Sequence, residues 1–229
     1  MTLSNVVLRR FVLLGTPVVV AIDVIFLHPI LPGGVREDLF PVANLWLNLH
    51  VVQLVLFWLM GAAAYLLLDG LRGLAATISR LAVAVFVIFY NAGDAVAGIA
   101  TGILARGALD LPDNEQAALA WAITRIFEDP MKQLIFTIGT YAWVVALLAA
   151  VVALYRAGAP RLPLVPLALA ASPFINFFEF DHNPPFNPVA LGLFFLAALW
   201  LELGWRKRVS GEGGPYYPEA SPGLDASPR

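Results

Sequence analysis

The sequence predicts an all-α integral membrane protein, a bundle of six transmembrane helices. Of its 229 residues, 60% are hydrophobic and 13% are charged, whereas soluble domains have about 45–50% and about 25%. Apolar runs of about 20 residues, the length that a helix needs to cross about 30 Å of hydrocarbon, recur six times. Cysteine is absent, which excludes disulfides and thiolate metal sites. These observations exclude a soluble globular enzyme.

The six predicted spans are separated by helix-ending signals. Pro32-Gly33-Gly34 follows the first, and Asp129-Pro130 and Asn187-Pro188 each place a capping side chain before a proline at the first helical position. Three prolines along the fifth span predict a kinked helix. The spans are approximately Phe11–Leu31, Leu45–Leu68, Arg80–Leu104, Pro130–Tyr155, Leu162–Phe180 and Pro188–Trp205.

The basic residues beside the spans predict the orientation. With the N-terminus inside, nine of them flank the spans on the inner side and four on the outer side, and basic residues favour the cytoplasmic side. Both termini are therefore expected in the cytoplasm, with the chain in an inner or plasma membrane. Residues 1–208 form the predicted six-helix domain, and residues 209–229, rich in Gly, Pro, Ser and Glu, a disordered cytoplasmic tail. A net charge of −2 gives no basic excess for nucleic acid, so the expected partner is the lipid bilayer.

The one long connection, residues 105–129, is predicted to hold an outer-face amphipathic helix. Asp113 followed by Gln116 resembles a capping box. Apolar residues then recur on one helical face, and Trp121 is placed to sit among lipid headgroups. That face comprises Leu119, Ile123, Ile126 and Phe127.

The third span carries the most informative polar residues. Asn91, Asp94, Gly98 and Thr101 recur at intervals of three or four and so share one helical stripe. Asp94 lies near the middle of the membrane, where a carboxylate must be neutral, paired or facing water. The motif Gly98-x-x-x-Gly102 permits close helix contact, and it offers a contact between two copies of the chain.

Polar residues in the first two spans extend the candidate site. Asp23 lies near mid-membrane, and His28, five residues later, is expected to point about 140° away on a straight helix. Those two residues are therefore not expected to face one cavity unless Pro17 or the end of the helix at His28-Pro29 distorts the geometry. In the second span Trp46, His50, Gln53 and Phe57 form one stripe that could line a cavity mouth.

The fifth span ends in further candidate ligands. Asn176 and Glu179 share a face, and Asp181-His182 follow in a proline-rich loop. The candidate ligand or proton site therefore comprises Asp94, Asn91, Asp23, His50, Gln53, Asn176 and Glu179. The candidate metal site comprises His50, His28, His182 and Asp181.

Three functions of different classes fit this pattern. The first is a protein that binds or transports a small solute or ion through a polar cavity open to the outer face, with Asp94 and Asp23 as proton- or cation-linked carboxylates. The second is a membrane-embedded metalloenzyme, a hydrolase or redox enzyme, whose histidines hold a divalent metal such as zinc. The third is a non-catalytic assembly subunit. We expect the first.

Overall fold

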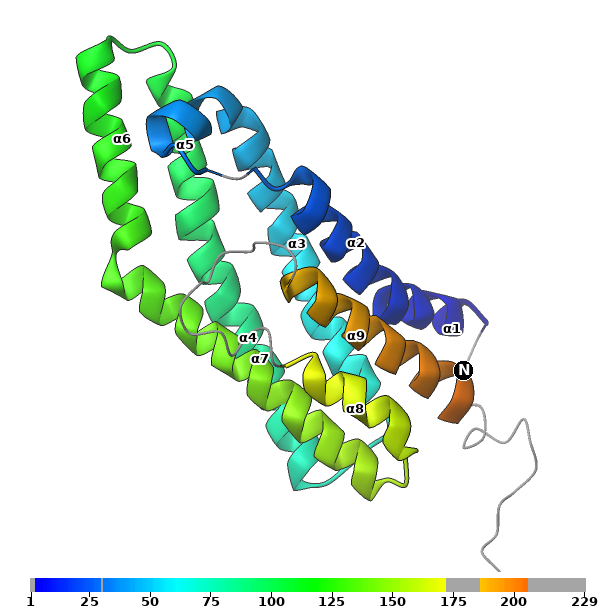
Figure 1. Ribbon diagram of the computed structural model, residues 1–229. Coiled ribbons are helices and arrows are strands. Elements are labelled where there is room, and N and C mark those ends of the chain that lie inside the picture. Colours follow the sequence, from blue (N-terminus) through cyan, green and yellow to red (C-terminus); the bar gives the residue numbers. More distant parts are fainter. Residues whose placement is uncertain (1–2, 30, 172–185, 206–229) are drawn as a thin grey trace, which may run out of the picture.

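The computed structural model describes residues 3–29, 31–171 and 186–205, and the side chains of residues 5–29, 31–171 and 188–205. Every regular element in these ranges is helical, as predicted (Figure 1). The elements are α1 (Leu3–Arg10), η1 (Phe11–Gly15), α2 (Thr16–Ile22), η2 (Asp23–Leu27), η3 (Val35–Leu39), η4 (Phe40–Val42), α3 (Ala43–Leu67), α4 (Leu74–Asp94), η5 (Ala95–Ala100), α5 (Thr101–Ala108), α6 (Asp113–Glu128), α7 (Pro130–Arg156), α8 (Arg161–Leu169), α9 (Phe186–Trp200) and η7 (Leu201–Trp205).

Five continuous helical segments are long and apolar enough to cross a membrane. They are Asn5–Leu27, Val35–Leu67, Leu74–Ala108, Pro130–Arg156 and Pro188–Trp205, and they coincide with five of the six predicted spans. The remaining span, Leu162–Phe180, begins as the short helix α8, and residues 172–180 lie outside the described residues. Six crossings therefore stay a prediction, as does the tail at residues 209–229.

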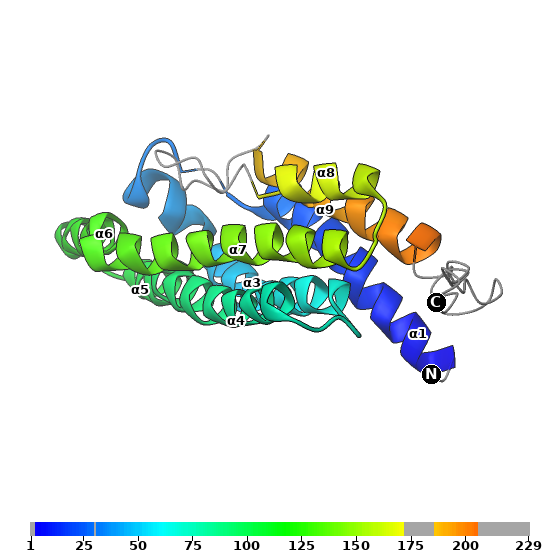
Figure 2. The same ribbon diagram turned by 90° about the horizontal axis from the view of Figure 1, so that it is seen from below.

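The helices pack in a closed ring. In order around the ring, α4 contacts α7, α7 contacts α8, α8 contacts α9, α9 contacts α2, α2 contacts α3, and α3 contacts α4 (Figures 1 and 2). Glycines bring α4 and α7 close together: a Cβ atom on Gly139 would lie 2.8 Å from the backbone nitrogen of Tyr90. Between the same helices, Ser79 donates a hydrogen bond to the carbonyl oxygen of Ala146 at 2.8 Å. Small and hydroxyl side chains of this kind are typical of helix contacts in membranes.

A buried ion pair ties the first helix to the last at one end of the bundle. The Arg9 guanidinium lies 2.7 Å from the Glu202 carboxylate, and the two side chains are 9% and 4% exposed. At the same end, Arg80 donates hydrogen bonds to the carbonyl oxygens of Leu68 and Leu71, which follow α3. Arg9 is one of the nine basic residues that predict the orientation, and its pairing with a residue 193 positions away is not predictable from its place in the sequence.

The predicted amphipathic helix is confirmed as α6, at the opposite end of the bundle (Figure 1). Leu119, Ile123 and Phe127 join a second, smaller hydrophobic core with residues of η3, η4 and α5, whereas Trp121 is 68% exposed. The predicted capping box is wrong. Asp113 instead accepts a hydrogen bond from Arg36 at 2.8 Å, and Gln116 donates to the carbonyl oxygen of Leu111.

The contact between α4 and α7 generates a stability prediction. Gly139→Ala should lower the free energy of unfolding by about 1–3 kcal/mol, because the added methyl group meets backbone that cannot rotate away. Gly107→Ala is the control, because nothing lies within 4 Å of a Cβ atom there. Thermal unfolding of both variants in detergent, followed by circular dichroism, measures the difference. Equal unfolding midpoints would contradict the packing described.

Candidate functional site

Asp94 ends α4 and lies against a widened stretch of helix. The next six residues, Ala95–Ala100, adopt a π-helical conformation (η5) before the α-helix resumes at Thr101. π-helical turns inside α-helices are frequent at functional sites. The Asp94 side chain is 1% exposed, and the predicted stripe is confirmed as a buried face, since Asn91 and Thr101 are also buried.

Asp23 is held by a glutamine from the neighbouring helix. The Gln53 amide of α3 donates a hydrogen bond of 2.7 Å to Oδ2 of Asp23, and the two residues are 0% and 4% exposed. Asp23 also opens a π-helical segment, η2. The two buried carboxyl groups of the site therefore lie each beside a π-helical segment, on two different helices.

His50 lies beside Asp94 and is oriented by its own helix. Its Nδ1 atom is 2.7 Å from the carbonyl oxygen of Trp46. A carbonyl only accepts, so Nδ1 carries the hydrogen, and in the neutral ring Nε2 is left as an acceptor. Nε2 lies 4.0 Å from Oδ1 of Asp94. A neutral His50 and an ionised Asp94 thus present two acceptors to each other with no hydrogen between them.

The absence of a side chain at Gly98 makes room for His50. A Cβ atom on Gly98 would lie 1.9 Å from Cδ2 of the imidazole, and one on Gly102 would lie 3.1 Å from the Cα atom of Leu47. The glycine motif therefore serves a close contact between α3 and the η5–α5 segment of one chain. The contact of Gly98 and Gly102 with a second copy of the chain, which the sequence suggests, stays a prediction.

Aromatic rings surround the histidine. The Trp46 ring lies 4.3 Å from the His50 ring, and its indole nitrogen donates to the Gly98 carbonyl oxygen at 3.0 Å. The His28 ring lies 5.3 Å from Trp46 and 5.4 Å from His50. The rings of His28, Trp46 and His50 therefore form one cluster, in which His50 lies beside Asp94.

The divergence of Asp23 and His28 predicted for a straight helix is not observed, because the helix is distorted here. Both side chains turn towards α3: Asp23 bonds Gln53, and His28 contacts Trp46 and His50. The reason is η2, in which the backbone nitrogen of His28 donates to the carbonyl oxygen of Asp23, five residues earlier. A π-helical turn holds more residues than an α-helical turn, so residues five apart return to similar faces.

Three buried side-chain oxygens near these groups have no hydrogen-bond donor in the described part of the chain. They are Oδ2 of Asp94, Oε1 of Gln53 and Oδ1 of Asn91. The Asn91 amide nitrogen bonds only its own helix, at the carbonyl oxygen of Val87. None of the described lysines or arginines forms an ion pair with Asp23 or Asp94. Unsatisfied buried acceptors of this kind require a proton, a cation or water.

The other predicted ligands are not placed by the structure. Asn176, Glu179, Asp181 and His182 lie outside the described residues. Among the residues that are described, no group of three or more histidine, aspartate and glutamate side chains could hold a metal ion. The structure therefore joins His28 and His50 but leaves the predicted metal site untested.

Comparisons with protein-family models, with curated proteins and with solved structures find no match to this chain.

The Asp23–Gln53 hydrogen bond generates a coupling prediction. Gln53→Leu should destabilise the protein by about 1–3 kcal/mol, because it leaves Asp23 buried without its donor. The double variant Asp23→Leu/Gln53→Leu should be no less stable than Gln53→Leu, since no buried carboxyl then needs a partner. The free energies of unfolding of the wild type, both single variants and the double variant measure the coupling. Strictly additive effects would show that the two groups do not interact.

Proposed function

We propose that the chain is a multi-pass protein of an inner or plasma membrane that binds or transports a small solute or ion, with Asp94 and Asp23 as its proton- or cation-linked carboxylates. The proposed topology has six spans, both termini in the cytoplasm, and α6 at the outer surface. The two ends of the bundle support this orientation. The end at which α1 lies holds Arg9, Arg10 and Arg80, and the opposite end holds α6.

The observation that carries the proposal is the facing pair of His50 and Asp94. Their nearest nitrogen and oxygen atoms are 4.0 Å apart, and both side chains are at most 3% exposed. One proton on either group, or one small cation between them, would convert two facing acceptors into a favourable contact. Ionisable groups this deep in an apolar bundle are characteristic of proton and ion pathways.

The surroundings of the pair support a site that opens by local rearrangement. Tyr90 lies one turn before Asp94 and contacts Phe57 and Phe136 with ring separations of 4.9 and 5.3 Å. Trp46, which contacts His50, also contacts Phe127 with a ring separation of 6.2 Å. The proposed route for solute from the outer side is a local change in η2 or η5, the two π-helical segments beside the carboxyl groups.

Trp46 provides the optical test, because its ring lies 4.3 Å from that of His50. We expect the tryptophan fluorescence of the detergent-solubilised protein to change on titration with protons or with Li⁺, Na⁺ or K⁺. Comparison with Trp46→Phe identifies the part of this fluorescence change that arises from Trp46. Asp94→Asn, which keeps the shape of the side chain, should abolish that part, whereas Asp110→Asn, in an exposed turn, should preserve it.

Two results would overturn the proposal. One is a wild-type protein whose Trp46 signal responds to none of these cations at any pH at which it stays folded. The other is an Asp94→Asn variant that responds like the wild type. Thermal unfolding of each variant, measured alongside, separates a lost response from a lost fold.

A further inference from the structure

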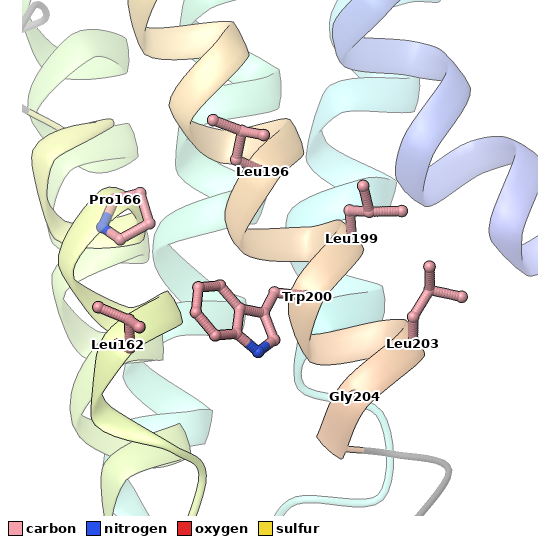
Figure 3. A pocket seen from close by; sticks show the side chains of 7 residues that line it. All are labelled: Leu162, Pro166, Leu196, Leu199, Trp200, Leu203 and Gly204. Atoms are coloured by element: carbon pink, nitrogen blue, oxygen red, sulfur yellow. The ribbon is translucent and has the colours of Figure 1, made fainter.

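An apolar groove runs along the outside of the bundle, away from the buried carboxyl groups. It lies between α8 and the α9–η7 helix and has a volume of about 630 Å³ (Figure 3). Leu162 and Pro166 line it from α8, Leu196 and Trp200 from α9, and Leu203 and Gly204 from η7. Its size falls within the range of small-molecule sites, about 300–1,000 Å³.

The residues that line the groove favour a flexible hydrocarbon chain over a packed helix as its occupant. Leu162, Leu196 and Leu203 are 61%, 55% and 45% exposed, so the walls are large, unpartnered side chains. Helices that pack together in membranes meet through small residues instead, as α3 and η5 do at Gly98. Within the described part of the groove, Gly204 is the one glycine, and the Trp200 ring already covers it, with Cδ1 3.1 Å from where a Cβ atom would stand.

A basic residue, Arg161, begins α8 directly before the groove-lining Leu162, although it does not itself line the groove. Arg161 is exposed and lies over the Tyr155 ring, with 5.8 Å from the guanidinium carbon to the ring centre. It forms no ion pair with any carboxylate in the described part of the chain. The indole nitrogen of Trp200 is turned towards the end of the groove at which Leu162 and Gly204 lie (Figure 3), as is typical of tryptophan at a headgroup boundary.

We propose that this groove binds an anionic phospholipid, with an acyl chain along the leucines and the phosphate at Arg161. The proposal rests on the membrane location in the proposed function but not on ion binding or transport. A guanidinium binds phosphate through two parallel hydrogen bonds, and the apolar walls accept a hydrocarbon chain. The headgroup of a zwitterionic lipid carries its own positive charge, which offsets the phosphate, whereas an anionic lipid keeps a net negative charge. The Arg161 guanidinium therefore favours an anionic lipid over a zwitterionic lipid with the same chains.

Native mass spectrometry of the full chain in detergent tests this, with dioleoyl phosphatidylglycerol and dioleoyl phosphatidylcholine added at equal concentration. We expect preferential retention of phosphatidylglycerol. Arg161→Ala should reduce that preference by about three- to tenfold, whereas Arg72→Ala, in the turn between α3 and α4, should not. Leu196→Trp, which fills the groove, should reduce retention of both lipids, whereas Leu81→Trp, on an exposed face of α4, should not.

Equal retention of the two lipids by the wild type, or equal losses in Arg161→Ala and Arg72→Ala, would overturn the proposal. The wild type could instead form dimers that carry no lipid and that Leu196→Trp disrupts. That result would overturn the lipid proposal and assign the groove to contact with a second copy of the chain. The Trp46 titration on the same variants keeps the proposals apart: lipid loss with an intact cation response affects the groove alone. Recovery of the expressed chain outside the membrane fraction would instead remove the membrane location on which both proposals rest.

Discussion

The burial of two carboxyl groups among apolar helices is the constraint on which the rest of this structure depends. An ionised carboxylate in a low-dielectric interior requires compensation, and the chain supplies it unequally. Asp23 receives a hydrogen bond from Gln53, whereas Asp94 faces the acceptor atom of His50 at 4.0 Å. The Asp23 carboxyl group therefore joins two helices through its hydrogen bond, whereas Oδ2 of Asp94 has no hydrogen-bond donor among the described residues.

Two of the described π-helical segments accompany the two carboxyl groups. The π-helical segments η2 and η5 begin at or directly after Asp23 and Asp94. Through η2, the first helix turns both Asp23 and His28 towards α3, and through Gly98 the third span admits the His50 ring. At the end of the bundle away from α6, charge is buried differently, as an ion pair between Arg9 and Glu202. The described part of the bundle thus buries charge in two ways: as an ion pair at one end, and in its middle as carboxyl groups that have no lysine or arginine partner.

Much of this arrangement could be predicted from the sequence, because apolar length and helical periodicity are local properties. Five spans, the α6 helix and the buried stripe of Asn91, Asp94, Gly98 and Thr101 followed from spacing alone. The convergence of His28 with His50 could not be predicted in the same way, because α-helical spacing gives the wrong direction for a side chain that follows a π-helical turn. The partner of Gly98 and the pairing of Arg9 with Glu202 were also missed, because sequence spacing does not specify which helices become neighbours.

The central claim is that Asp94 exchanges a proton or cation rather than serving as a permanently satisfied structural group. Infrared difference spectroscopy of the purified protein across a pH titration tests it most directly, through the carbonyl stretching band of a protonated carboxyl group. The account predicts a buried carboxyl band that changes with pH or with added cation and is absent in Asp94→Asn. A spectrum that is the same in the wild type and in Asp94→Asn, with both proteins folded, would contradict it.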